Sequence, residues 1–166
     1  MKPYFLIPFL GLLALIQTTL APVLAPFNVK PDLMLVTVVC WSVLRGAREG
    51  TTWAFVGGLS LDMFSSGPFG LSALALMVIS LTASLGELNI FRSHVLLPLV
   101  AVIVGTVAHT AVYLLGLQLW GNYVAWFDIA RRIMLPTLFV NILLVPLIYP
   151  ALNSIHHLTG REEITW

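Results

Sequence analysis

Charged side chains are scarce in this sequence. Only 8 Lys and Arg and 7 Asp and Glu residues occur among 166, whereas 59% of the residues are hydrophobic. Soluble domains average about 25% charged residues, because a surface that faces water needs them. The composition therefore argues against a soluble globular domain and predicts a protein whose solvent is lipid.

Other residue patterns are missing as well, and their absence argues against several classes of function. Lys and Arg form no cluster, which argues against a nucleic-acid partner, since phosphates require a basic patch. Cys40 is the single cysteine, so neither an internal disulfide nor a thiolate metal cluster is expected. The sequence also lacks a phosphate-binding loop and a zinc-binding His pair of the metalloprotease type. We expect no catalytic residues, no cofactor and no metal.

Long apolar runs predict an all-α polytopic transmembrane bundle, forming a single integral membrane domain over residues 1–166. A bilayer span needs about 20 apolar residues. The first run exceeds the apolar core of a secretory signal and lacks an Ala-x-Ala cleavage site, so we expect it to be retained. Six spans are predicted, over residues 4–24, 31–45, 49–64, 71–87, 95–119 and 132–152.

The breaks between the predicted helices carry their own signals. The second and third helices are near the minimum spanning length, and they are predicted to form a tight hairpin about residues 45–50 unless one is re-entrant. Pro31 is predicted to begin the second helix, with Asn28 as its N-cap. Residues 65–70 are a strong turn signal. The aromatic stretch over residues 120–132 predicts either an interfacial helix or an ordinary aromatic belt.

The distribution of cations predicts the orientation. Lys and Arg favour cytoplasmic loops. With six spans, five cations share the side of the termini and three lie on the other: Lys2, Arg45, Arg48, Arg92 and Arg161 against Lys30, Arg131 and Arg132. We therefore expect both termini on the cytoplasmic side of the membrane.

Asp62 is an ionisable residue within a predicted span, where charge is costly. Gly50, Ala54 and Gly58 precede it at four-residue spacing, a stripe of small residues that favours close helix packing. We interpret Asp62 as structural, capping the next turn or meeting a neighbouring helix. A role in binding a proton or ligand is the alternative.

His109 is the second ionisable residue within a span, and a hydrogen bond to a neighbouring helix explains it without chemistry. Gln17, Thr18, Thr19 and Asn141 are interpreted as packing contacts or a small polar lining. A triad of Ser60, His109 and Asp62 is an alternative interpretation, but polar residues of these types are common enough to occur together by chance.

Three segments carry a family resemblance. Lys30-Pro31-Asp32-Leu33-Met34-Leu35 opens the predicted second helix, and residues 54–71 read Ala-Phe-Val-Gly-Gly-Leu-Ser-Leu-Asp-Met-Phe-Ser-Ser-Gly-Pro-Phe-Gly-Leu, before Ala73-Leu74-Ala75. Ile90-Phe91-Arg92 follows the predicted fourth helix. These segments and the six-span layout resemble the rod shape-determining membrane protein family, MreD.

The resemblance implies a non-catalytic subunit of the complex that elongates the cell wall and maintains cell shape. Its implied partners are a bitopic MreC-type protein, MreB filaments, a lipid-linked-precursor glycosyltransferase and a penicillin-binding transpeptidase. The implied fold is similar to that of the substrate-binding subunits of energy-coupling-factor vitamin transporters.

That kinship leaves an alternative, a substrate-binding subunit for small-molecule uptake, and an intramembrane hydrolase ranks third. An uptake subunit would need a pocket with convergent polar groups, for which Asp62, His109 and Asn141 are the available residues. The candidates for structure or partner contact are Asp32, Gly50, Ala54, Gly58, Asp62, Gly67, Pro68, Gly70 and His109.

Overall fold

The computed structural model describes residues 3–24, 30–65, 68–85, 96–121 and 125–158, and all regular structure in them is helical. The elements in chain order are α1 (Pro3–Leu24), α2 (Leu33–Phe64), α3 (Leu71–Leu85), α4 (Leu96–Leu119), α5 (Trp126–Ile129), a π-helical turn (Ala130–Met134) and α6 (Leu135–Leu158). The all-α fold class is thus confirmed for the described residues.

Helix α2 is a hairpin of two antiparallel arms, residues 33–45 and 47–64. The chain reverses at Gly46, whose φ of 79° and ψ of −178° are not helical. Across the arms, Trp41 stacks on Trp53 with ring centroids 4.2 Å apart, and the side chain of Ser42 lies against the Cα of Gly50. The predicted tight helical hairpin is therefore confirmed.

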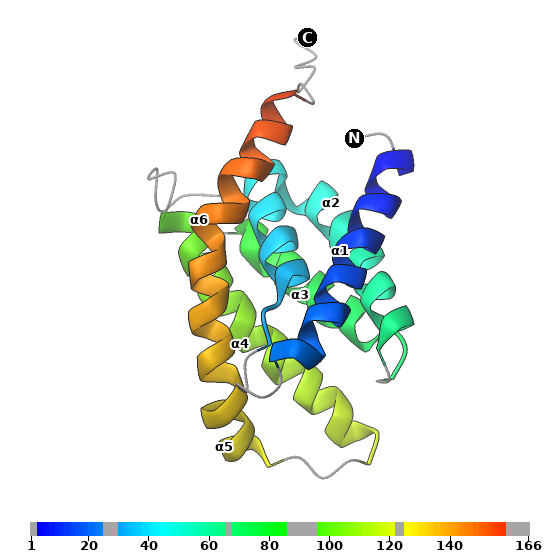
Figure 1. The fold of residues 1–166 in the computed structure, drawn as a ribbon, viewed down its shortest axis with the longest axis vertical. Helices are drawn as coiled ribbons and strands as arrows, with labels where there is room; N and C mark the ends of the chain where they lie inside the picture. Colours follow the sequence, from blue (N-terminus) through cyan, green and yellow to red (C-terminus); the bar gives the residue numbers. More distant parts are fainter. Residues whose placement is uncertain (1–2, 25–29, 66–67, 86–95, 122–124, 159–166) are drawn as a thin grey trace.

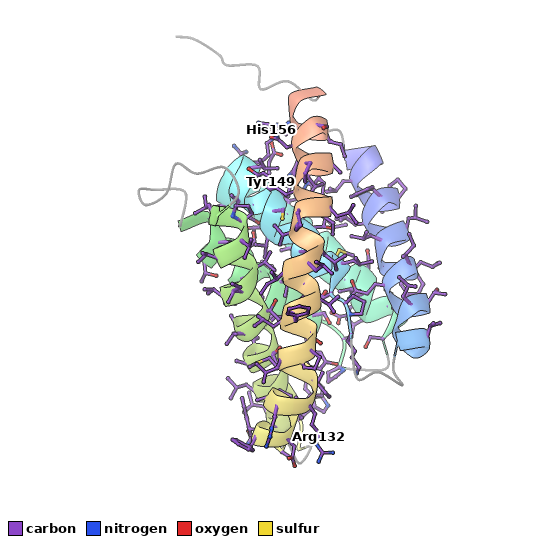
Figure 2. All side chains as sticks on the ribbon, turned by 60° about the vertical axis from the view of Figure 1, so that its left-hand side comes forward. Arg132, Tyr149 and His156 are labelled. Atoms are coloured by element: carbon purple, nitrogen blue, oxygen red, sulfur yellow. The ribbon has the colours of Figure 1, made fainter. Side chains whose placement is uncertain are left out.

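Successive helices run in opposite directions (Figure 1). The first turn of α1 and the last turn of α6 lie at one end of the bundle, whereas the C-terminus of α4 and α5 lie at the other. Figure 2 places Arg132 and His156 at these opposite ends. The Gly46 turn lies at the end that contains His156, because the Arg45 guanidinium bonds the carbonyl oxygen of His156.

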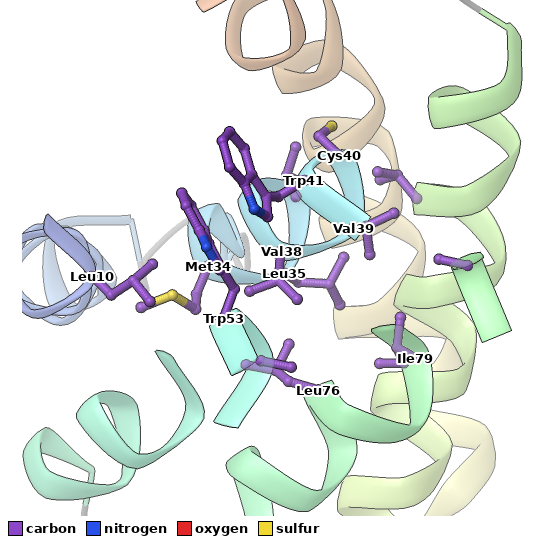
Figure 3. Close-up of a cluster of buried hydrophobic side chains, with 14 of the residues drawn as sticks. Leu10, Met34, Leu35, Val38, Val39, Cys40, Trp41, Trp53, Leu76 and Ile79 are labelled. Atoms are coloured by element: carbon purple, nitrogen blue, oxygen red, sulfur yellow. The ribbon is translucent and has the colours of Figure 1, made fainter. Parts of the chain in front are cut away.

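The first arm of α2 forms the centre of the bundle. Every residue from Met34 to Val43 is buried, and α2 contacts α1, α3, α4 and α6. A helix that is apolar on all sides is either buried in a core or spans a membrane, and this arm is buried among its neighbours. Figure 3 shows the resulting cluster, in which Leu10 of α1 and Leu76 and Ile79 of α3 surround both arms.

The outer surface of the bundle is apolar as well. On α6, Leu135, Phe139, Leu143 and Leu147 recur every fourth residue and are all exposed. Within the described ranges, two helical segments are long and apolar enough to cross a membrane, Leu97–Leu119 and Trp126–His156, and Leu6–Leu20 and Leu71–Ser84 are shorter apolar helices. A continuous apolar exterior of this kind suits lipid rather than water.

The aromatic stretch before α6 does not form a separate helix. Ile129 and Ala130 keep right-handed helical backbone angles, so α5 continues through the π-helical turn into α6. The last helical segment is consequently longer at both ends than the predicted 132–152, because nothing between Trp126 and Leu135 breaks it. Trp120 and Phe127 are strongly exposed near its start, and residues 122–124 lie outside the described part of the chain.

Candidate functional site

Asp32 is the N-cap of α2. Its Oδ1 accepts a hydrogen bond of 3.1 Å from the backbone N–H of Leu35, one of the donors that a first helical turn leaves free. The helix therefore begins at Leu33, and the prediction that Pro31 begins it with Asn28 as the cap was wrong for the start of the helix. Asn28 itself lies outside the described residues.

Gln17 of α1 bonds to the same helix end in two ways. Its Nε2 donates to Oδ1 of Asp32 at 3.1 Å, and its Oε1 accepts from the backbone N–H of Met34 at 2.8 Å. The amide thus satisfies a second free N–H of α2 while it holds the carboxylate. This double contact fixes α1 against the start of α2.

Asn141 of α6 bonds to the same helix end through the backbone of Asp32. It is fully buried, and its Oδ1 accepts from the backbone N–H of Asp32 at 2.9 Å. Its Nδ2 donates to Oγ1 of Thr106 at 3.1 Å, and the Thr106 hydroxyl donates to the carbonyl of Val102 at 2.8 Å. A single amide therefore links α2, α4 and α6.

His109 of α4 completes the group. Its Nδ1 lies 3.4 Å from Oδ2 of Asp32, and both side chains are largely buried. Its ring also faces that of Tyr113, with centroids 6.2 Å apart. The expected contact of His109 with a neighbouring helix is confirmed, and the partner is a carboxylate.

These contacts form what we call the polar network, which consists of Gln17, Asp32, Thr106, His109 and Asn141. It joins four helices through contacts between its side chains and through hydrogen bonds from these side chains to backbone groups. Interhelical polar bonds of this kind fix helix positions in lipid. The arrangement can hold these side chains, and the helices that carry them, in fixed orientations through hydrogen bonds.

Asp62 caps the next helix from the end of the hairpin. It is 5% exposed, and its carboxylate accepts from three backbone N–H groups: Gly70 at 2.9 Å, Ser72 at 3.2 Å and Ala73 at 3.4 Å. A carboxylate at a helix N-terminus also interacts favourably with the helix dipole. These contacts are the ones that capping the next turn requires, and the structural role of Asp62 stays a prediction.

The turn between α2 and α3 brings the backbone N–H of Gly70 within hydrogen-bond distance of Asp62. Gly70 has a φ of 93°, which favours glycine, and the carbonyl of Pro68 accepts from Leu71 at 3.3 Å. Gly67, another candidate, lies outside the described residues. Asp62, Pro68 and Gly70 thus belong to one local structure that orients α3.

The stripe of small residues lies at two close helix contacts. Gly50 faces the hydroxyls of Ser42 and Ser80, which lie 2.8 Å apart, and Ala54 is fully buried. Gly58 is packed against the backbone of Ala73 in α3. The stripe therefore packs the second arm against the first arm and α3, as small residues between membrane helices do.

The candidate triad of Ser60, His109 and Asp62 does not form. The Ser60 hydroxyl donates to the carbonyl of Val56 at 2.8 Å, Asp62 accepts from α3, and His109 lies against Asp32. Each residue has a different partner, so the arrangement supplies no nucleophile activated by a base.

The sequence candidates that the structure describes thus separate into two polar sites and the packing stripe of Gly50, Ala54 and Gly58. The structure brings Asp32 and His109 together in the polar network, and places Asp62 with Pro68 and Gly70 at the turn. Gln17 is predicted as a packing contact or lining and Asn141 also as a pocket residue, whereas in the structure both supply bonds that join α1 and α6 to the start of α2. The available signal for each was an amide within an apolar helix, although α6 carries a second amide, Asn153, near its end.

An all-helical bundle with an apolar exterior and polar side chains paired between helices has the architecture of a helical membrane protein. No characterised protein and no solved structure gives a significant match to the chain. A family model matches residues 1–155, and the chain belongs to that family, the rod shape-determining protein MreD family. The resemblance seen in residues 31–92 is thereby confirmed, and a role in rod-shape determination follows.

Proposed function

We propose that this chain is a non-catalytic subunit of the complex that elongates the bacterial cell wall. In this proposal it binds an MreC-type bitopic membrane protein and helps link MreB filaments to a lipid-linked-precursor glycosyltransferase and a penicillin-binding transpeptidase. Membership of the MreD family is the observation that carries the proposal. The whole chain acts as a single integral membrane domain.

The polar network supports a scaffold rather than a reactive site. Asp32 receives contacts from Gln17, His109 and a backbone N–H, and its own N–H is bound by Asn141. Groups engaged in this way hold helices in fixed positions. A fixed bundle presents a constant lipid-facing surface against which the span of a bitopic partner can pack.

The proposed topology has six spans in the bacterial cytoplasmic membrane: α1, the two arms of α2, α3, α4 and the α5–α6 segment. Both termini are cytoplasmic in this arrangement, and the Gly46 turn with Arg45 and Arg48 faces the cytoplasm. The excess of Lys and Arg on that side supports this orientation. Fusions of a cytoplasm-specific and an exterior-specific reporter to Trp166 test it, and an exterior signal rejects it.

Co-purification in mild detergent is the test of function. We expect the tagged chain to recover an MreC-type protein and wall-synthesis enzymes, and loss of the chain to convert rods to spheres. A variant that disrupts the polar network, Asn141→Leu, should reduce recovery of these partners. Recovery of a pair of ATPases would instead indicate an uptake transporter.

The alternative, a substrate-binding subunit for uptake, receives less support from the site. Such a subunit needs polar groups that converge on a cavity. Asn141 and Asp62 instead direct their polar atoms to backbone N–H groups and to Thr106. Asn141 and Asp62 are thus engaged in holding the bundle together, whereas His109 contacts Asp32 through Nδ1 and its buried Nε2 has no hydrogen-bond partner among the residues that the structure describes.

A further inference from the structure

A cavity of about 310 Å³ lies between α1 and the second arm of α2, next to the Gly46 turn. Its lining residues are Leu6, Arg48, Glu49, Thr52 and Trp53. Its volume is at the lower end of the range of about 300 to 1,000 Å³ that is typical of small-molecule sites. The polar network and the Asp62 turn contribute no residue to it.

The lining combines an apolar wall with charges of both signs. Leu6 and Trp53 are almost fully buried and supply the apolar wall. Arg48, Glu49 and Thr52 supply a guanidinium, a carboxylate and a hydroxyl. A ligand that fits this lining carries an anion, a cation and an apolar portion close together.

The polar side chains of the lining differ in whether they already have an ion-pair or hydrogen-bond partner. Glu49 pairs with Arg45 at 3.5 Å through Oε1. The Arg48 side chain is exposed and has no ion-pair partner among the residues that the structure describes. The Thr52 hydroxyl donates to the carbonyl of Arg48 at 3.0 Å, which leaves its oxygen free to accept. Arg48 is therefore the group available to an anion, and Glu49 and Thr52 are acceptors for a cation.

The position of the cavity indicates that such a ligand comes from the lipid bilayer. It lies beside the hairpin turn, at the end of the bundle where α1 begins and α6 ends (Figure 1). In a membrane protein the ends of the helices lie at the level of the phospholipid headgroups. Pockets between helices at this level, when they contain basic residues, bind lipid headgroups.

We propose that this cavity binds the headgroup of a zwitterionic phospholipid that carries a phosphate and a primary ammonium. The phosphate lies against the Arg48 guanidinium, which presents several N–H donors to its oxygens. The ammonium donates to the Glu49 carboxylate and the Thr52 hydroxyl. The glycerol and the first methylenes pack on Leu6 and Trp53.

The test uses the purified full chain and three dioleoyl lipids: phosphatidylethanolamine, phosphatidylglycerol and phosphatidylcholine. Retained lipid is measured by native mass spectrometry after exposure to equal mixtures. We expect phosphatidylethanolamine to exceed each of the others by about tenfold, because phosphatidylglycerol lacks the ammonium and choline has no N–H to donate. Equal retention of all three lipids would overturn the proposal. An excess of phosphatidylglycerol would assign the cavity to anionic lipid and also overturn it.

Variants locate the binding in this cavity. Arg48→Gln should lower retention of phosphatidylethanolamine about tenfold, whereas Arg132→Gln at the opposite end should leave it unchanged. Glu49→Gln should remove the preference for phosphatidylethanolamine over phosphatidylglycerol. Thr52→Val should weaken that preference while the charge of the lining stays the same. Size-exclusion elution like that of the wild type establishes that each variant is folded. Unchanged retention in folded Arg48→Gln protein would reject the site.

Competition by soluble phosphoethanolamine tests whether the headgroup alone is sufficient for binding. If the apolar wall contributes, this compound should compete only at concentrations far above those of the lipid. Competition at equal concentrations would show that the cavity takes a free phosphate compound, and the lipid assignment would be wrong. Neither result depends on co-purification of wall-synthesis proteins, so the proposed function is tested separately.

Discussion

The backbone N–H of Asp32 donates a hydrogen bond of 2.9 Å to Oδ1 of Asn141, 109 positions away in the sequence. Asn141 is fully buried, so its amide cannot turn to water. Because its Nδ2 also donates to Thr106, the angle of α6 is fixed relative to α2 and α4 together. The central hairpin and the longest apolar segment are thus connected through one side chain.

Replacing Asn141 should destabilise the bundle. Asn141→Leu leaves the Asp32 N–H without its acceptor, at a cost of about 1 to 3 kcal/mol. We expect a lower unfolding temperature for the purified chain in detergent. Leu147→Ala is the control, because Leu147 lies on the same helix and is 71% exposed. Equal shifts for the two variants would show that the Asn141 contacts contribute nothing specific.

Gly58 should not tolerate a methyl group. A Cβ at this position would overlap Cα and N of Ala73, and backbone atoms cannot move aside as a flexible side chain can. Gly58→Ala should therefore cost about 1 to 3 kcal/mol through overpacking, and Gly58→Leu more. The measurement is the unfolding temperature together with the amount of protein that accumulates in membranes.

Gly11→Ala is a matched control for Gly58→Ala. A Cβ on Gly11 would meet nothing within 4 Å. Both substitutions are within helices and gain the same helix propensity of about 1 kcal/mol. The difference between them therefore reports the contact with Ala73, and a Gly58→Ala protein as stable as Gly11→Ala would contradict close packing.

Local features of the fold could be predicted from the sequence. The hairpin follows from a glycine between charged residues at Arg45–Gly50, which interrupts two apolar runs. The turn before α3 follows from the Ser, Gly and Pro residues of 65–70. Asp62 lies only 8 positions from Gly70, so its capping role was within reach of local reasoning.

Distant pairings could not be predicted in the same way. Asp32 belongs to a motif that the sequence reveals. Its contact with His109 depends on the rotation of α4 about its axis and on the position of α4 along the bundle. Hydrophobic periodicity is weak in helices that are apolar on most sides, so it does not reveal which face turns inward. The joining of α5 to α6 was missed for a related reason, since aromatic residues suit an interface and a helix equally.

Gly46 should be required for the hairpin turn. Its φ of 79° with ψ of −178° lies in a region that is essentially restricted to glycine. Gly46→Ala should therefore cost about 1 to 3 kcal/mol, and Gly46→Asn should be no better, because this is not the left-handed helical region that Asn accepts. Ala47→Ser, at an exposed neighbour, is the control in the same thermal unfolding assay. Full stability of Gly46→Ala would mean that the two arms can be joined in another conformation.

Substitution of Asp62 separates capping from proton chemistry. Two of its three bonds, to Gly70 and Ala73, end on Oδ2, and the bond to Ser72 ends on Oδ1. Asp62→Asn can keep the first two with its single oxygen, whereas Asp62→Leu loses all three. We expect Asn to cost about 1 kcal/mol and Leu about 3 kcal/mol or more, because buried donors are left unsatisfied.

The same pair of variants should differ in the cell. With each as the only copy, Asp62→Asn should preserve rod shape and recovery of an MreC-type partner, and Asp62→Leu should lose both together. A residue that carries a proton would fail equally with either substitution, since neither side chain exchanges a proton near neutral pH. Membrane levels of each variant, measured by immunoblot, distinguish loss of protein from loss of action. If Asp62→Asn protein accumulates and binds its partner while the cells become round, the carboxylate has a function beyond capping α3.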